Sequence, residues 1–132
     1  MKQEIIFPTT YDTLENLDHM KIIGPLTMDS RKNRVYIVPN VKLKLNQNEF
    51  DALYMLAIRE NISLSFEWLY NAIWDLGDGT DRRKEAIKGI EKVVKRINNV
   101  GAGFVWISKS SPDTYTYHSI WGHNINEWQT DS

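Results

Sequence analysis

Residues 81–98 read DRRKEAIKGIEKVVKRIN, and this stretch decides the fold that the sequence predicts. Ile90, Val93, Val94 and Ile97 recur at the spacing of one helical face, which predicts an amphipathic helix. Seven Lys or Arg and two Glu lie between residues 82 and 96, a local net charge of +5 in a chain whose total is −1. The segment therefore presents a strongly positive surface to any polyanion.

Two shorter helices are predicted before the basic one. Asn46 and Glu49 have the spacing of a capping box, and the apolar residues that follow define one helical face that ends at Asn61. Ser65 is a second N-cap, and Gly77 marks the end of the helix that it starts.

Strands are predicted on both sides of the helices. Alternating, β-branched and aromatic residues indicate four short strands, at residues 20–23, 26–28, 34–38 and 41–45. After the basic helix, the pattern indicates a hairpin with strands at 104–107 and 114–117. The predicted class is α+β, a winged helix-turn-helix with an N-terminal antiparallel sheet, three helices and a C-terminal β-hairpin wing. We expect this domain to span residues 20–118, between an acidic N-terminal extension (1–19) and a C-terminal tail (119–132).

Two motifs resemble the winged-helix effector domains of OmpR/PhoB-type response regulators. Residues 45–53, LNQNEFDAL, are similar to the family motif L-T-x-x-E-F-x-L-L, with Asn46 at its threonine. Residues 65–74, SFEWLYNAIW, are similar to S-R-E-x-L-x-x-x-V-W, with Phe66 at its arginine. The resemblance covers residues 20–118 and implies a DNA-binding module. Nineteen preceding residues are too few for the family's phosphoreceiver domain, so we expect a standalone effector domain.

The third helix and the wing depart from the family pattern. Gly89 stands at the family's histidine, and Lys92 stands at an arginine that often reaches DNA. Gly89 indicates either a close approach to DNA or a tolerated packing accident, since glycine inside a helix costs about 1 kcal/mol relative to alanine. The wing signature R-G-x-G-Y is absent, with Lys109 near its arginine and Tyr115 or Tyr117 near its tyrosine.

The leading functional prediction is sequence-specific binding of double-stranded DNA by a single-domain transcriptional regulator of bacterial type. Helix 81–98 would enter the major groove, with Lys88 and Lys92 as base readers and hairpin 104–118 as the wing. The predicted DNA-contacting residues are Arg82, Arg83, Lys84, Lys88, Lys92, Lys95, Arg96, Lys109 and Tyr115. The alternative is a winged-helix protein–protein interaction module that has lost DNA binding. An acidic N-terminus that folds over the basic helix would favour this alternative or indicate autoinhibition.

A protein partner is also predicted. Trp74 and the loop after it correspond to the family's loop that contacts RNA polymerase, although core packing is the alternative for Trp74. The two tail tryptophans either pack back on the domain or form a partner surface. The predicted partner-contact residues are Trp74, Asp75, Asp78, Trp121 and Trp128. We also expect a homodimer on DNA, because one small module gives limited affinity.

Other classes of function are not supported by the residue pattern. The chain has no cysteine, and His19, His118 and His123 are not spaced as metal ligands, so neither a metal nor a cofactor is expected. No catalytic constellation is present, so we do not expect an enzyme. Neither a signal peptide nor a membrane-length apolar run is found, and a cytoplasmic location is expected.

Overall fold

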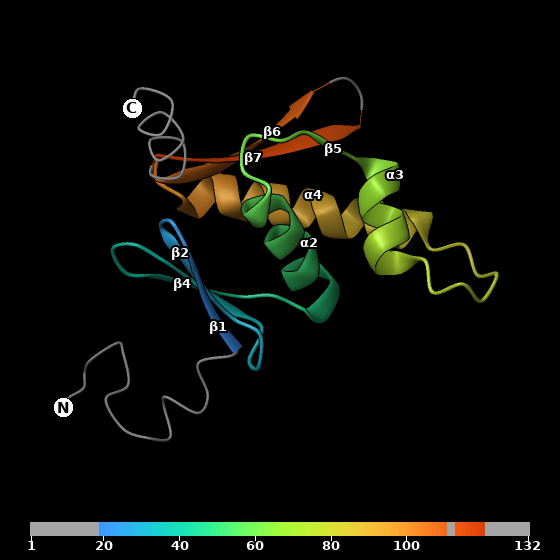
Figure 1. Ribbon diagram of the computed structural model, residues 1–132, viewed down its shortest axis with the longest axis horizontal. Coiled ribbons are helices and arrows are strands. Elements are labelled where there is room, and N and C mark those ends of the chain that lie inside the picture. Colours follow the sequence, from blue (N-terminus) through green and yellow to red (C-terminus); the bar gives the residue numbers. More distant parts are fainter. Residues whose placement is uncertain (1–18, 111–112, 121–132) are drawn as a thin grey trace, which may run out of the picture.

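The computed structural model describes residues 19–110 and 113–120. Two sheets lie on opposite sides of a helical layer (Figure 1). The elements in chain order are β1 (Met20–Ile23), β2 (Leu26–Asp29), β3 (Arg34–Ile37), β4 (Val41–Lys44), α2 (Gln47–Ile58), β5 (Leu64–Ser65), α3 (Phe66–Leu69), a π-helical turn η2 (Tyr70–Trp74), α4 (Arg83–Val100), β6 (Val105–Ser110) and β7 (Thr114–Ser119). Residues 1–18 of the expected extension and residues 121–132 of the expected tail, with Trp121 and Trp128, lie outside the described residues.

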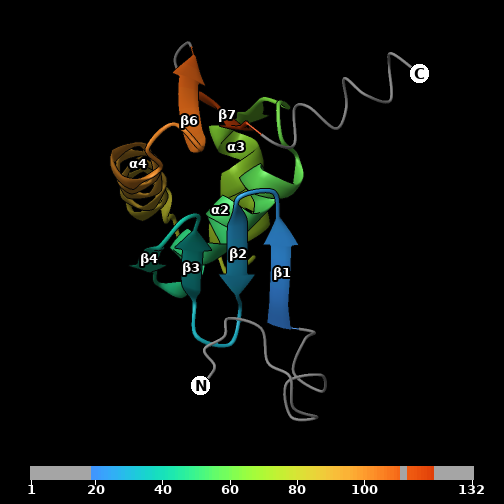
Figure 2. The same cartoon turned by 90° about the vertical axis from the view of Figure 1, so that its left-hand side faces the viewer.

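The N-terminal sheet is an antiparallel meander in the order β1-β2-β3-β4 (Figure 2). Its inner face is apolar: Met28, Val35 and Leu43 are aligned across β2, β3 and β4, and all three are buried. Burial of alternate residues is what the period of a strand requires of a sheet with one face on a core. The four strands predicted from the sequence are confirmed.

The predicted capping box starts α2. The Glu49 backbone N–H donates to Asn46 Oδ1 at 2.8 Å, and the Asn46 backbone N–H donates to Glu49 Oε1 at 3.0 Å. Two N–H groups that lack helical partners are thereby satisfied. The carboxylate of Glu49 is buried as a result, which becomes important for Lys92 below.

The second helical segment differs from its prediction in its shape. Ser65 caps it as predicted, since the Trp68 backbone N–H donates to Ser65 Oγ at 3.1 Å. The segment is regular only through α3 and then widens into η2, where the Asp75 backbone N–H donates to the Tyr70 carbonyl at 2.9 Å. It therefore ends at Trp74, before Gly77.

The basic helix α4 is displaced by two residues from the predicted 81–98. It begins at Arg83, directly after a residue that Tyr70 holds: the Arg82 backbone N–H donates to the Tyr70 hydroxyl oxygen at 3.0 Å. It ends at Val100, where Gly101 passes so close to β6 that an added Cβ would lie 2.1 Å from the Val105 carbonyl oxygen. Glycine is required there because the backbone of β6 lies too close for a side chain. The backbone conformation is not the reason, because Gly101 has an ordinary helical φ of −66°.

The predicted hairpin is β6 and β7, and both strands are longer than predicted. The second sheet has the order β5-β7-β6, because Leu64 and Ser65 of β5 pair with Tyr115 and Thr114. This pairing was not predicted from the sequence. α2 and α4 share one core with both sheets, built around Leu53, Ile90 and Ile97. The predicted winged-helix class is thus observed, and no helix of the described part is long and apolar enough to cross a bilayer.

Candidate nucleic-acid interface

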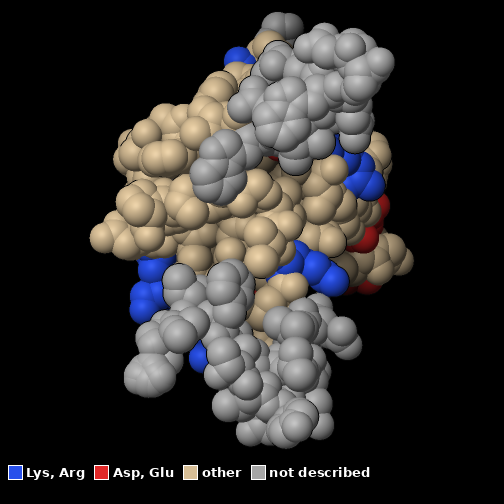
Figure 3. Space-filling model, turned by 60° about the vertical axis from the view of Figure 1, so that its left-hand side comes forward, with Lys and Arg blue, Asp and Glu red and all other residues tan. Residues whose placement is uncertain are grey.

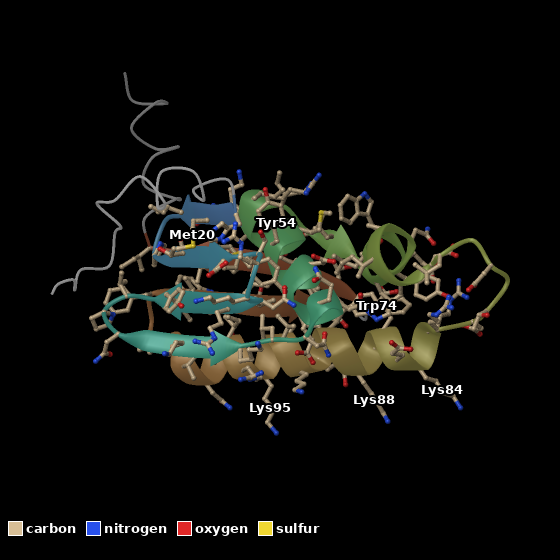
Figure 4. The ribbon with its side chains drawn as sticks, turned by 90° about the horizontal axis from the view of Figure 1, so that it is seen from below. Met20, Tyr54, Trp74, Lys84, Lys88 and Lys95 are labelled. Carbon is tan, nitrogen blue, oxygen red and sulfur yellow. The ribbon has the colours of Figure 1, made fainter. Side chains whose placement is uncertain are left out.

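Three lysines form a stripe along the outer side of α4. Lys84, Lys88 and Lys95, which we call the lysine stripe, are exposed and lie at i, i+4 and i+11. At about 100° per residue these positions lie within about 40° of one another, and the stripe is about 16 Å long. The buried residues Ala86, Ile90, Val93 and Ile97 lie on the opposite side of the helix. Figure 4 shows the three side chains projecting from one side of α4, away from the sheet and the other helices.

The stripe carries positive charge that no carboxylate of the described residues neutralises. Within the described part of the chain, no carboxylate pairs with Lys84, Lys88 or Lys95. Charge is unevenly distributed over the molecule. The face in Figure 3 consists mostly of uncharged side chains, with Lys and Arg at several places around it and Asp and Glu at its right edge.

The two arginines at the start of α4 are occupied by the protein's own acids. Arg82 makes a two-pronged contact with Asp78, with Nη1–Oδ1 at 3.0 Å and Nη2–Oδ2 at 2.7 Å. This contact, with the Thr80 backbone N–H, holds the pKa of Asp78 far below its usual range. Arg83 lies 3.3 Å from Glu67 and its guanidinium stacks over the Tyr70 ring at 4.7 Å. Both arginines thus brace the loop before α4.

Lys92 and Arg96 connect α4 to its neighbours on one flank. Lys92 Nζ lies 3.4 Å from Oε2 of Glu49, the buried carboxylate of the capping box. Arg96 Nη1 donates to the Lys44 carbonyl oxygen at 2.8 Å, which fixes β4 beside α4. Lys92, predicted to read bases, therefore has a structural task that Lys88 does not have.

The wing is attached to the other flank of α4. The side-chain amide of Asn98 donates to the Ile107 carbonyl at 2.9 Å and accepts from its N–H at 2.8 Å. Lys109 Nζ lies 3.7 Å from Glu91 Oε2, so α4 also contacts the wing through an ion pair. Tyr115, predicted to contact DNA, is buried beneath Lys109, whose Nζ is 5.7 Å from the ring centroid. Its burial removes Tyr115 from the candidate interface.

Of the predicted partner-contact residues that the structure describes, one is buried and two lie in an exposed loop. Trp74 is buried, as the core-packing alternative required, and its ring packs against α4 at Gly89. Burial removes Trp74 from any direct partner contact. Asp75 and Asp78 lie in the exposed loop, where Asp75 Oδ1 accepts from the Gly77 backbone N–H at 3.0 Å. Both carboxylates therefore help to shape the loop.

Sequence reasoning missed the residues that position the helix. Tyr70 and Asn98 act on backbone groups 12 and 9 residues away in the chain, a separation that no local pattern records. Lys42 and Lys44, which are exposed on β4 next to α4, are also absent from the predicted set of DNA contacts. Among the described residues, no cluster of His, Cys, Asp or Glu could hold a metal ion.

The fold is shared with known DNA-binding domains. No protein-family model matches the chain, and no curated protein matches it in sequence. The C-terminal domain of the nisin resistance regulator NsrR, a lantibiotic response regulator, aligns with 72% of this chain and 93% of its own, at 18% identity and a TM-score of 0.57. The DNA-binding domain of the response regulator AdeR, solved with an intercistronic region, aligns with 75% of this chain and 99% of its own, at 15% identity and a TM-score of 0.57.

A longer regulator contains the same fold as one part. The Thermotoga maritima OmpR/PhoB homologue DrrB aligns over 76% of this chain but only 45% of its own, at 18% identity and a TM-score of 0.58. The chain therefore has the winged-helix fold of OmpR/PhoB-type DNA-binding domains, as the two sequence motifs predicted.

Proposed function

We propose that this domain binds double-stranded DNA as a transcriptional regulator, with α4 in the major groove and the β6–β7 hairpin as the wing. The observation that carries the proposal is the lysine stripe, which faces solvent directly opposite the packed side of α4. A helix fits a major groove about 12 Å wide, and lysines on its outward side reach phosphates and guanine edges. Cytoplasmic location and binding as a homodimer belong to the same proposal.

The pattern of ion pairs divides the candidate residues by role. Lys84, Lys88 and Lys95 supply the DNA-facing charge. Lys109 lies at the wing, where a phosphate would have to replace its exposed partner Glu91. Arg82, Arg83, Lys92 and Arg96 hold α4 in place, so their removal would weaken binding through the scaffold. We therefore assign base reading to Lys88 in preference to Lys92, because the ammonium group of Lys92 is paired with a buried carboxylate.

A titration separates the proposal from a general attraction to polyanions. Fluorescence anisotropy with a duplex of about 25 base pairs, room for two half-sites, is measured at about 50 and 200 mM salt. Lys88→Ala is compared with Lys21→Ala, a lysine that is exposed on β1. β1 is three strands from β4, or about 14 Å. We expect Lys88→Ala to lower affinity and Lys21→Ala to leave it unchanged.

Specificity needs its own measurement. Selection of bound duplexes from a random pool should yield a common sequence for the wild-type chain, and Lys88→Ala should relax one position of it. Binding that ignores both salt and Lys88→Ala would contradict the proposal. So would a pool from which no duplex is retained.

A protein partner is a second candidate, favoured by the loop before α4. Leu76 there is 67% exposed, the most exposed large apolar side chain among the described residues, and it lies between Asp75 and Asp78. An apolar group with acidic neighbours suits a basic protein surface such as one on RNA polymerase. Loss of transcription activation in Leu76→Ser with unchanged DNA affinity would support this contact, and unchanged activation would reject it.

A further inference from the structure

The N-terminal sheet and its turns contain a second excess of positive charge. Residues 19–45 carry six Lys or Arg and a single acid, a local net charge equal to that of the basic helix. The single acid, Asp29, is buried, and its carboxylate accepts hydrogen bonds from the backbone N–H groups of Arg31 and Lys32. One acid against six cations leaves this segment strongly positive.

The cations nearest to the basic helix are on β4. Lys42 and Lys44, which we call the β4 pair, are both exposed, with Leu43 buried between them. β4 is the edge strand of its sheet, and the bond from Arg96 to the Lys44 carbonyl fixes that edge against α4. Figures 2 and 4 both show β4 lying alongside α4.

The β4 pair occupies an unfavourable position in the isolated protein. Lys44 lies directly opposite Arg34 in the β3–β4 register, and like charges facing each other across a sheet repel. Within the described ranges, no carboxylate forms an ion pair with Arg34, Lys42 or Lys44. A bound anion would relieve this repulsion.

The geometry of the DNA major groove indicates that this anion is a phosphate of the DNA backbone. A helix in the major groove has a phosphate backbone on each side of it, because the groove walls are the two strands. One flank of α4 carries the wing, with Lys109. The other flank carries β4, which Arg96 contacts, and the start of α2, where Glu49 pairs with Lys92.

We propose that the β4 pair binds the phosphate backbone on the flank of α4 opposite the wing, so that β4, at one edge of the N-terminal sheet, is part of the DNA-binding surface. This inference rests on the proposed function. Each part of the interface then contacts a different part of the duplex. The lysine stripe enters the major groove, the wing contacts the backbone of one DNA strand, and the β4 pair contacts the backbone of the other DNA strand. Sequence information then comes from α4, and register on the duplex comes from the two flanks.

The test is the salt dependence of binding to the same duplex of about 25 base pairs. Lys42→Ala/Lys44→Ala should lower the magnitude of the slope of log K against log salt by about 1 to 2, because each lost phosphate contact contributes about 0.9. Affinity at about 0.1 M salt should fall on the order of tenfold. The sequence selected from a random pool should not change. Lys21→Ala is the matched control, since it removes an exposed lysine from the far edge of the same sheet.

Each outcome decides between the two proposals. If Lys88→Ala weakens binding but Lys42→Ala/Lys44→Ala behaves as Lys21→Ala does, the phosphate contact of the β4 pair is wrong and the proposed function stands. If the wild-type chain binds no duplex, both fail. If the double variant binds more tightly, the β4 pair serves another anionic group, such as the acidic residues near the N-terminus, and the phosphate contact is overturned. Unchanged thermal unfolding of the double variant confirms that the loss is not one of folding.

Discussion

Gly89 and Trp74 are in direct contact at the interface of α4 and η2. A Cβ built on Gly89 would lie 2.8 Å from Cζ2 of the Trp74 ring, closer than carbon atoms approach in folded proteins. The ring is buried and has little room to shift. Glycine in the middle of α4 is therefore required by packing against the indole. Neither alternative drawn from the sequence, an approach to DNA or a packing accident, includes this reason.

This contact predicts a specific non-additive pair of substitutions. Gly89→Ala should lose about 1 kcal/mol of unfolding free energy, because overpacking of 1–3 kcal/mol outweighs a gain in helix propensity of about 1 kcal/mol. In a Trp74→Phe background, the smaller ring leaves room for the methyl group, and Gly89→Ala should become neutral or stabilising. Urea unfolding of the four proteins measures this coupling.

The opposite pattern would indicate that Gly89 serves DNA instead. Gly89→Ala would then stabilise the free domain in the wild-type background and weaken DNA binding. An alanine that stabilises the domain whether residue 74 is Trp or Phe would contradict the packing account.

Lys92 and Lys88 differ in what they contribute to stability. Lys92→Ala should cost about 1 kcal/mol, because it leaves the buried Glu49 carboxylate without its cationic partner, although the ammonium end of that pair is solvated. Lys88→Ala should change stability by less than about 0.5 kcal/mol, as for most surface substitutions. In a Glu49→Gln background, Lys92→Ala should cost nothing. An equal cost in both backgrounds would show that the ion pair is not the cause.

The sequence predicts the elements of this fold well because their signals are local. The capping box at Asn46, the N-cap at Ser65 and the alternation in β4 each act within a few residues, and each is present in the structure. The predicted bounds of the basic helix, 81–98, differ from those of α4 by two residues at each end. The hydroxyl of Tyr70, a residue of an earlier element, contacts the backbone N–H of Arg82 just before the start of α4, and no local pattern predicts this contact.

The candidate site was less predictable because charge pairing depends on distant residues. Nothing in residues 81–98 indicates that Arg83 is held by Glu67 or that Lys92 is held by Glu49. A predicted set of nine DNA contacts thus contains scaffold cations and the buried Tyr115. The charge of residues 19–45, by contrast, can be read from the sequence by counting, and only the contact of β4 with α4 gives it significance.

Asn98 attaches the edge strand of the wing to α4, and its loss should loosen the wing. Asn98→Ala removes two hydrogen bonds to Ile107, so unfolding free energy should fall by about 1–2 kcal/mol despite a better helix propensity. Asn99→Ala is the matched control, since this neighbouring asparagine is exposed and should become neutral or slightly stabilising. Hydrogen exchange at the Ile107 amide should accelerate in Asn98→Ala alone. Equal protection of that amide in both variants would contradict the role of Asn98.

Tyr117 has a hydroxyl group with no hydrogen-bond partner among the described residues, and its side chain is fully buried. Replacement by Phe removes a desolvated polar atom without changing the ring. Tyr117→Phe should therefore leave the domain equally stable at neutral pH or stabilise it by about 1 kcal/mol. A loss of more than about 1 kcal/mol would mean that the hydroxyl has a partner in the folded chain.

The same burial predicts how stability depends on alkaline pH. Desolvation, with the nearby negative charge of Glu60, raises the pKa of Tyr117 well above its ordinary value. The unfolded chain releases this phenolic proton near pH 10, whereas the folded chain retains it. Stability from Tyr117 is thus fully present below about pH 10 and is lost above it, by up to about 1.4 kcal/mol per pH unit. Between about pH 8 and 11, the free energy of urea unfolding should fall more for wild type than for Tyr117→Phe. The lysines titrate in the same range, but their contribution is the same in both proteins and is removed by the comparison. Parallel losses in the two proteins would mean that Tyr117 ionises as freely in the folded chain as in the unfolded one.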